Sequence, residues 1–368
     1  MAKSDLKIDI RTSPYIRKAP SVAQIMRNVI YALLPLAAYS VYQFGISALA
    51  LLLVTTLSCM ATEHFFCWMS GKKSTILDAS AAVSGLLLAM TLPPGFPLWM
   101  GAVAGFTAIA MGKTLFGGLG FNVFNPALVG RAFIQAAFPV SITTWTPALA
   151  VDRFVEFIPS TLALPFMKPA ATAEWTAQVA IDGFSGATPL ALMKFQGIIT
   201  DSYDLFIGNV AGSAGETSSL LILLCGLYLV YKNMLDWRIP AAVIFGTMIT
   251  AELFYFLDPS KYPSPAFMVF SGGLMFAAVF MASDMVASPV TPLGIFVFGV
   301  LVGFLTVIIR LFGGLTDAVM YAILFGNAAT PIIETYTQPR IYGARKKAKE
   351  KSCVRQKIKY PRCHQAPN

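Results

Sequence analysis

Long apolar blocks separated by short polar segments dominate the sequence between residues 26 and 336. The blocks lack a period-two alternation of apolar and polar residues, which excludes an outer-membrane barrel and favours a bundle of membrane helices. We predict spans at roughly 26–43, 46–68, 78–93, 98–116, 120–139, 218–235, 239–257, 265–284, 292–311 and 316–336. The predicted fold class is an all-α polytopic membrane protein with about ten transmembrane helices.

A recurring pentapeptide divides these spans into two halves. The sequence LFGGL at 115–119 returns at 311–315, and a proline-interrupted stretch precedes each copy. An asparagine followed by a proline comes after each copy. An odd number of spans per half inverts the second half relative to the first, so we expect two inverted five-helix repeats with broken helices, at 26–139 and 218–337. Chance recurrence of common residues is the alternative.

Composition and charge support a membrane location. Hydrophobic residues make up 56% of the 368 residues and charged residues 12%, about half the charged share of soluble domains. The net charge of +9 does not indicate nucleic-acid binding, because ten of the 27 Lys and Arg residues lie between 340 and 362. Basic ends are typical of cytoplasmic anchors. We therefore expect both termini, residues 1–25 and the basic tail 338–368, in the cytoplasm of a cell with an inner membrane.

The same orientation places the loop 140–217 at the periplasmic face. From 140 to 216 this loop holds seven acidic and three basic residues, opposite to the basic ends of the chain. The five cysteines form no CxxC pair, and there are two histidines. A zinc site or an iron–sulfur cluster built from this chain alone is therefore not expected.

One stretch of the outer loop presents a hydroxyl group among small residues. It contains Asp182, Ser185, Gly186, Ala187 and Thr188, followed by a proline that holds the threonine extended. We therefore expect Thr188 to be exposed and sterically approachable. On local composition alone, a plain turn with a capping threonine is the favoured interpretation.

This stretch resembles the flavinylation signature of the D subunits of Rnf complexes, which is shared by the B subunit of the sodium-pumping NADH:quinone reductase. The block 122–133 and the N-terminal residues 13–15 also resemble this family. The resemblance implies that a flavin transferase attaches FMN through its phosphate to Thr188. It further implies a second, non-covalent flavin, riboflavin, within the helix bundle.

The block 115–133 is rich in Gly and Asn at membrane depth. Irregular backbone there is tolerated only where it is buried or lines a cavity. Amide side chains suit the edge of a flavin ring, so we place the riboflavin near Asn122, Asn125 and the matching Asn327. Helix–helix contacts made by small and polar residues are an equally weighted alternative.

Ionisable residues within or beside the spans are costly there and often functional. They are Glu63, His64, Asp78, Lys113, Arg131, Glu252, Asp284, Arg310 and Asp317. We expect Asp78, Lys113, Arg310 and Asp317 to lie near span ends and to reach the membrane surface by snorkelling. Glu63, Arg131 and Glu252 remain candidates for ion pairs or for an ion path.

The resemblance implies a membrane subunit of an Rnf-type complex that relays electrons between NADH and ferredoxin couples and translocates Na⁺ or H⁺. Such a chain is not catalytic alone. Its partners would be A-, B-, C-, E- and G-type subunits, the flavin transferase and the lipid bilayer. One alternative is the B-type subunit of the quinone reductase. Another is an inverted-repeat solute transporter or channel without a cofactor, which explains the repeat but not the Thr188 motif.

Overall fold

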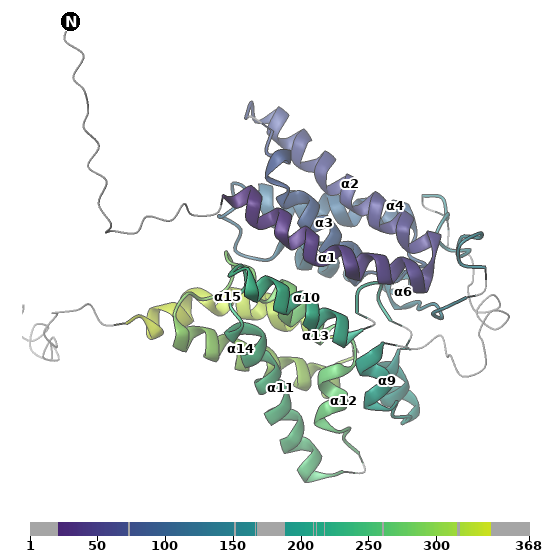
Figure 1. Cartoon of the computed structure of the whole chain (residues 1–368), viewed down its shortest axis with the longest axis vertical. Helices are drawn as coiled ribbons and strands as arrows, with labels where there is room; N and C mark the ends of the chain where they lie inside the picture. Colours follow the sequence, from purple (N-terminus) through teal and green to yellow (C-terminus); the bar gives the residue numbers. More distant parts are fainter. Residues whose placement is uncertain are drawn as a thin grey trace, which may run out of the picture.

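The computed structural model describes residues 21–339 apart from 73, 151, 166, 168–187, 209, 211, 217, 260 and 315–316. All regular structure in these residues is helical. Figure 1 shows two groups of helices lying against each other. Each of the predicted spans contains helix, whereas the number of membrane crossings and the inverted relation of the halves stay predictions.

The first group is built from the N-terminal part of the chain. Its elements are α1 (Val22–Phe44), α2 (Ile46–Met69), η1 (Ile76–Asp78), α3 (Ser80–Thr91), α4 (Leu98–Ile109), the π-helical η2 (Ala110–Thr114), α5 (Pro126–Ala137) and α6 (Pro139–Thr143). The predicted span 120–139 becomes helical only at Pro126. The LFGGLG turn before it contains Gly117, Gly118 and Gly120 with positive φ angles, which helices do not accommodate. Asn125 then caps α5 by accepting the N–H of Ala127.

The second group of helices follows the segment that connects the two halves. It consists of α10 (Ser219–Tyr231), α11 (Arg238–Leu257), α12 (Pro265–Phe270), α13 (Leu274–Phe276), the π-helical η4 (Ala277–Met281), α14 (Pro292–Phe312) and α15 (Val319–Thr337). The predicted span 265–284 is interrupted at residues 271–273, between α12 and α13. Among the described helices, α1, α2, α11 and α14 are long and apolar enough to cross a membrane, and α3 and α10 are shorter apolar helices.

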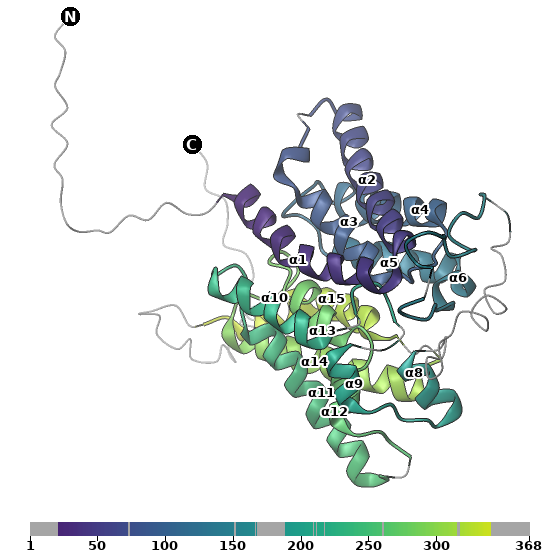
Figure 2. The same cartoon turned by 45° about the vertical axis from the view of Figure 1, so that its right-hand side comes forward.

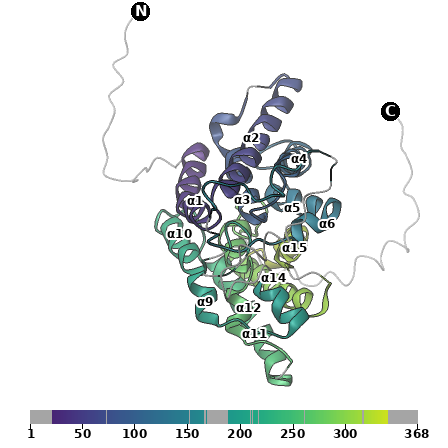
Figure 3. The same cartoon turned by 90° about the vertical axis from the view of Figure 1, so that its right-hand side faces the viewer.

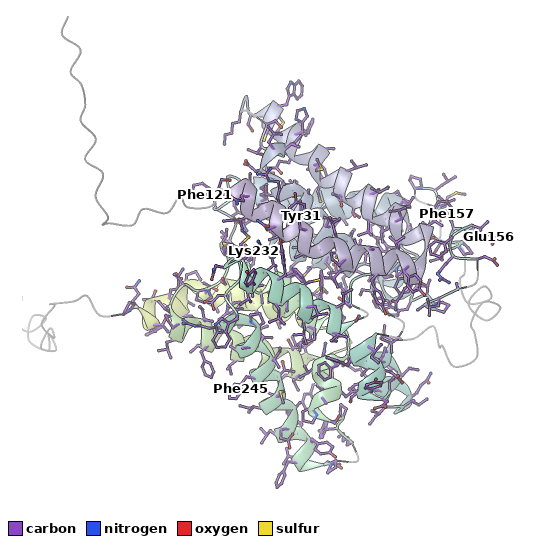
Figure 4. All side chains as sticks on the ribbon, viewed as in Figure 1. Tyr31, Phe121, Glu156, Phe157, Lys232 and Phe245 are labelled. Carbon is purple, nitrogen blue, oxygen red and sulfur yellow. The ribbon has the colours of Figure 1, made fainter. Side chains whose placement is uncertain are left out.

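The two groups meet along a central interface. Helix α1 packs against α10, and α5 packs against α15, as Figures 2 and 3 show from two further sides. The start of α1 and the end of α15 lie at the same end of the molecule. Glu156 and Phe157, in the segment that connects the halves, lie at the opposite end (Figure 4). Helix α1 therefore begins, and α15 ends, on the side of the molecule opposite these two residues (Figures 1 and 4).

Much of the connecting segment is packed into the helix ends. Its first part covers α1, α2 and α4: the N–H of Ile46 donates to Arg153 O at 2.9 Å, and that of Leu98 to Thr161 O at 3.1 Å. Its second part forms α8 (Pro189–Ala191), the π-helical η3 (Leu192–Gln196) and α9 (Ser202–Ile207) beside the second group. Further on, the N–H groups of Ala214 and Gly215 donate to carbonyl oxygens at the end of α3. The segment is therefore part of the tertiary structure.

Arg310 is 1% exposed and hydrogen bonds to the carbonyl groups at the break in the second group. Its guanidinium donates to Met268 O at 2.6 Å and to Ser271 O at 3.0 Å, at the C-terminal end of α12. These carbonyl groups lack helical partners because α12 stops there. A buried cation therefore stabilises a helix end that the bilayer could not solvate.

We expect Arg310→Met to lower the unfolding temperature of the purified protein in detergent. The change leaves two buried carbonyl groups unpaired, each at a cost of about 1–3 kcal/mol. Arg238→Met, at the exposed start of α11, is the matched control and should unfold like the wild type. Equal unfolding temperatures for both variants would contradict the capping role of Arg310.

Candidate functional site

Thr188 occupies the N-cap position of α8. Thr188 is buried, with 8% of its surface exposed, which corrects the expectation of an exposed threonine. The cause is its packing on the second group of helices, where its Oγ1 accepts the N–H of Ala191 at 3.3 Å. Asp182, Ser185, Gly186 and Ala187 lie outside the described residues. In this hydrogen bond Oγ1 accepts through a lone pair, and its own proton is not involved. The cap is therefore compatible with a covalent bond to Oγ1.

The segment that carries Thr188 is held on the second group of helices. Leu190 is buried in a cluster with Leu205 and Phe267. Lys194 Nζ donates to Arg310 O at 2.9 Å and also to Gly313 O, at the C-terminal end of α14. Partial burial lowers the pKa of Lys194. These contacts place Thr188 at the end of the molecule where α14 ends.

A small pocket of about 30 Å³ adjoins Thr188. Its walls include the aromatic side chains of Trp145 and Phe270 and the acidic side chains of Glu216 and Asp317. Glu216 and Asp317 also line a second small cavity, which contains Arg131. The two acidic residues therefore separate the Thr188 pocket from the interior of the bundle.

Arg131 of α5 joins both acidic residues. Its Nη2 donates to Asp317 Oδ2, its Nη1 lies 3.4 Å from Glu216 Oε1, and Nη1 also donates to Thr91 O at the end of α3. Arg131 is 3% exposed. One buried guanidinium therefore links two helices of the first group with the segments that precede α10 and α15.

Glu216 is a buried carboxyl group in the connecting segment. Its Oε2 accepts the hydroxyl of Ser213 at 2.7 Å. Burial, with the nearby charge of Asp317, raises the pKa of Glu216 to about 7, although Arg131 and the Ser213 hydroxyl act in the opposite direction. Glu216 is therefore less acidic than a carboxyl group in water.

The break between α12 and α13 makes room for this arrangement. Gly272 has φ +62°, and a Cβ atom there would lie 2.7 Å from Leu190 Cδ1. A Cβ atom on Gly273 would collide with Glu216 Oε1. Two consecutive glycines are needed here because the segments that carry Thr188 and Glu216 approach the backbone so closely.

A larger cavity, of about 120 Å³, lies between the two groups of helices. Its polar lining includes Ser80, Lys113, Asn122, Asn125 and Asp284, and apolar residues of α1, α3, α10 and η4 complete the walls. Of the three asparagines predicted to lie near one flavin, Asn122 and Asn125 line this cavity. Asn327 is 2% exposed and is absent from this lining.

The two asparagines differ in their hydrogen bonding. Asn125 caps α5 and also donates to Met281 O at 3.4 Å, so it connects the halves. Asn122 donates to Phe124 O at 3.2 Å and hydrogen bonds to Asp284. Its buried Oδ1 has no partner among the described residues. Such an orphaned acceptor beside a cavity fits a ligand with N–H donors.

A family model described as NQR2, RnfD, RnfE matches residues 9–343. The chain belongs to this family. It is 40% identical to the D subunit of the Na⁺-translocating ferredoxin:NAD⁺ oxidoreductase complex of Acetobacterium woodii, over 94% of this chain and 99% of that protein.

Other relatives in the NQR2, RnfD, RnfE family have similar coverage. The D subunit of the proton-translocating ferredoxin:NAD⁺ oxidoreductase complex of Clostridium ljungdahlii is 37% identical over 94% of this chain and 100% of that protein. The D subunit of the ion-translocating oxidoreductase complex of Halorhodospira halophila is 35% identical over 91% and 95%. Two relatives of comparable identity thus carry names that specify different ions.

The structure corrects the expectation that several ionisable residues reach the membrane surface by snorkelling. Lys113 and Arg310 do not snorkel, because they are 3% and 1% exposed and bind buried partners. Asp317 is paired with Arg131. Glu63 is buried and bonded to Lys113, whereas Glu252 is exposed on α11. Snorkelling was expected because each residue lies near a span end, where the sequence does not reveal a partner.

Sequence reasoning missed three polar residues that contribute to these sites. Ser80 lines the central cavity, Ser213 binds Glu216, and Thr75 binds Glu63. Small hydroxyl residues are common in membrane helices and carry no distinctive pattern. The sequence did contain one signal of a buried ion pair, because Glu63 and Lys113 have opposite charges and lie in spans of the same half.

We expect Gly273→Ala to destabilise the protein, because the new methyl group must displace the Glu216 carboxylate from Arg131. Breaking a buried ion pair typically costs about 3–5 kcal/mol, so the unfolding temperature in detergent should fall. Gly314→Ala, where a Cβ atom would meet no neighbour within 4 Å, is the control. If Gly273→Ala unfolds at the temperature of Gly314→Ala, the close contact with Glu216 is wrong.

Proposed function

We propose that this chain is the D-type membrane subunit of an Rnf-type complex and carries FMN on Thr188. The central observation is the placement of Thr188 at the end of α14, with an Oγ1 whose proton the described cap does not use. The family membership and the names of the relatives support this assignment. A bound flavin supplies one- and two-electron transfer, and the chain supplies its position.

The surroundings of Thr188 fit a tethered flavin whose ring lies outside the pocket. The pocket of about 30 Å³ is the smaller of the two candidate flavin sites, since the central cavity measures about 120 Å³. A phosphodiester is negatively charged, and Glu216 and Asp317 would repel it from the pocket floor, although Arg131 partly neutralises them. We infer that Trp145 and Phe270 provide apolar contacts beside the attachment point, where covalent attachment keeps the cofactor from diffusing away.

We propose a second, non-covalent flavin in the central cavity. This cavity has about four times the volume of the Thr188 pocket (120 against 30 Å³), apolar walls, and several polar groups on one side, as ligand sites commonly have. Asn122 Oδ1 would accept an N–H of the ring, and Lys113 would lie beside it. Val279 and Phe280 of η4 form part of the apolar wall.

Electron donors and acceptors would bind to other subunits. In this proposal the outer flavin exchanges electrons with a partner at the face of the connecting segment, and the central flavin continues the relay through the bundle. Coupling to Na⁺ or H⁺ would follow from charge changes at these centres, because the buried acids beside both sites respond to a nearby charge. Moving one charge against about 100 mV costs about 2.3 kcal/mol.

A B-type subunit of a sodium-pumping quinone reductase is the second candidate, since the family model includes NQR2. The relatives named above are subunits of ferredoxin:NAD⁺ oxidoreductase complexes and favour the Rnf type. Quinone reduction by the purified complex, with ferredoxin as the competing acceptor, separates the two candidates.

For the covalent flavin, the test is fluorescence of the denatured chain on a gel after co-expression with a flavin transferase. The wild type and Thr188→Ser should fluoresce, because both offer a hydroxyl group, and Thr188→Val should be dark. Thr200→Val, in the same segment, is the control and should fluoresce. A dark wild-type band, with the transferase active on another substrate, would favour the cofactor-free transporter.

For the central flavin, we expect Asn122→Leu to lower the amount of flavin released from the purified complex by denaturation. The substitution removes an acceptor and fills part of the cavity, while the covalent flavin on Thr188 serves as an internal standard. Asn327→Ala, which alters a buried asparagine away from the cavity lining, should retain the released flavin. Equal loss in both variants would place the ligand elsewhere or indicate a general folding defect.

A further inference from the structure

A buried ion pair of the first group lies beside the central cavity. Lys113 Nζ donates to Glu63 Oε1 at 2.6 Å and to Ser80 Oγ at 2.7 Å. Glu63 is 5% exposed and Lys113 is 3% exposed. The pair connects α2 with η2, and the second partner of Lys113 begins α3.

This pair is connected to the exterior on one side. Thr75, an exposed residue in the turn after α2, donates its hydroxyl to Glu63 Oε1 at 2.5 Å. A hydroxyl group can accept one proton while it donates another, so it can pass protons between solvent and a buried carboxylate. No described residue donates a hydrogen bond to the other carboxylate oxygen of Glu63, the buried Oε2. That oxygen is therefore free to take a proton.

The other side of the pair opens on the cavity. Both Lys113 and Ser80 belong to the cavity lining. An ammonium group has three N–H donors, and Glu63 and Ser80 occupy two of them. The remaining donor of Lys113 is available to a ligand. Thr75, Glu63 and Lys113 thus form a continuous hydrogen-bonded chain from the exposed end of α2 to the cavity.

Among its described residues, the second half lacks this arrangement. Glu252 lies near the end of α11, as Glu63 lies near the end of α2, but it is exposed. The basic residue just before the second LFGGL motif, Arg310, caps α12 instead. Among the described residues, the buried acid–base pair is therefore a feature of the first half.

We propose that Glu63 and Lys113 form a proton relay between the membrane face at which α2 ends and the central cavity. This inference rests on the proposed central flavin, which takes up a proton when it is reduced by electrons from a partner subunit. An N–H bond of the Lys113 ammonium breaks and its proton passes to the flavin. A proton from water then passes through the Thr75 hydroxyl to Glu63, and from Glu63 to the Lys113 amine. One proton has moved and both side chains are restored.

Other titratable groups surround the relay. Cys59 lies on α2 close to Glu63 and Lys113, and His64 Nδ1 is 3.2 Å from Ser74 Oγ. Asp78 belongs to η1, and Asp284 lies on the far wall of the cavity. None of these four residues hydrogen bonds to Glu63 or Lys113. The thiol of Cys67 contacts the relay at its exposed end, with Sγ 3.6 Å from Thr75 Oγ1.

The test uses Glu63→Gln in the assembled complex. Glutamine keeps an oxygen that accepts from Thr75 and Lys113 but cannot carry the proton. We expect a normal content of both flavins and a reduction of the central flavin slowed by about a hundredfold, a typical effect of losing a positioned acid–base group. The matched control is Glu252→Gln, which should behave like the wild type.

Two readouts go beyond turnover. The slowed phase should show a larger solvent deuterium isotope effect and a changed pH profile in rapid-mixing measurements. Time-resolved infrared spectra recorded during reduction should show a transient carboxylic-acid band in the wild type, and this band should be missing from Glu63→Gln. Wild-type rates, isotope effect and infrared bands in a Glu63→Gln complex that retains its flavins would overturn the relay and leave the proposed function intact.

The absence of a non-covalent flavin from the wild-type complex would overturn both the central flavin and the relay. If Glu63→Gln does not assemble, Thr75→Val decides the question, because Thr75 is exposed and its loss does not unpair Lys113. Thr75→Val should slow proton-coupled reduction, and Thr75→Ser should restore it. Equal rates in these two variants would exclude the relay.

Discussion

The position of Arg131 is the constraint on which the organisation of the outer end of the bundle depends. Its guanidinium is buried and binds a carbonyl group of α3 and the carboxylates of Glu216 and Asp317. In a bilayer, none of these groups has water as an alternative partner, so separation of the segments would leave unpaired charges. The connecting segment must therefore enter between the halves for Glu216 to reach Arg131, and Thr188 follows to the same end of the molecule.

The broken helix of the second half makes this convergence possible. Consecutive glycines at 272–273 let the Thr188 segment and Glu216 approach the backbone more closely than any side chain would permit. The break exposes carbonyl groups of α12, and Arg310 satisfies them. Lys194 in turn binds the carbonyl groups where α14 ends. Each of these two helix ends is thus compensated by a cation from a neighbouring segment, which keeps irregular backbone stable at membrane depth.

The cavity between the halves and the pocket at Thr188 lie in different electrostatic environments. The pocket is lined by acids that share one arginine, and it is smaller than the central cavity. The central cavity has an ammonium group, amides and one acid on its walls. This difference is suited to a relay in which one cofactor is tethered outside and another is enclosed. It also gives the buried pair of Glu63 and Lys113 a chemical role that an isolated structural ion pair would not require.

The sequence by itself determined the class of protein and the approximate positions of most helices, but not the breaks before Pro126 and at residues 271–273. Apolar length is enough to predict a membrane helix, and local motifs were enough to single out Thr188 and the block around Asn122. Only the tertiary structure decided that Lys113 is buried with Glu63, and that Asn327 lies apart from the cavity lining. Partner choice depends on contacts between residues far apart in the chain, such as 63 and 113 or 131 and 317. A periodic pattern records which face of a helix is apolar, but it does not record which distant charge meets that face.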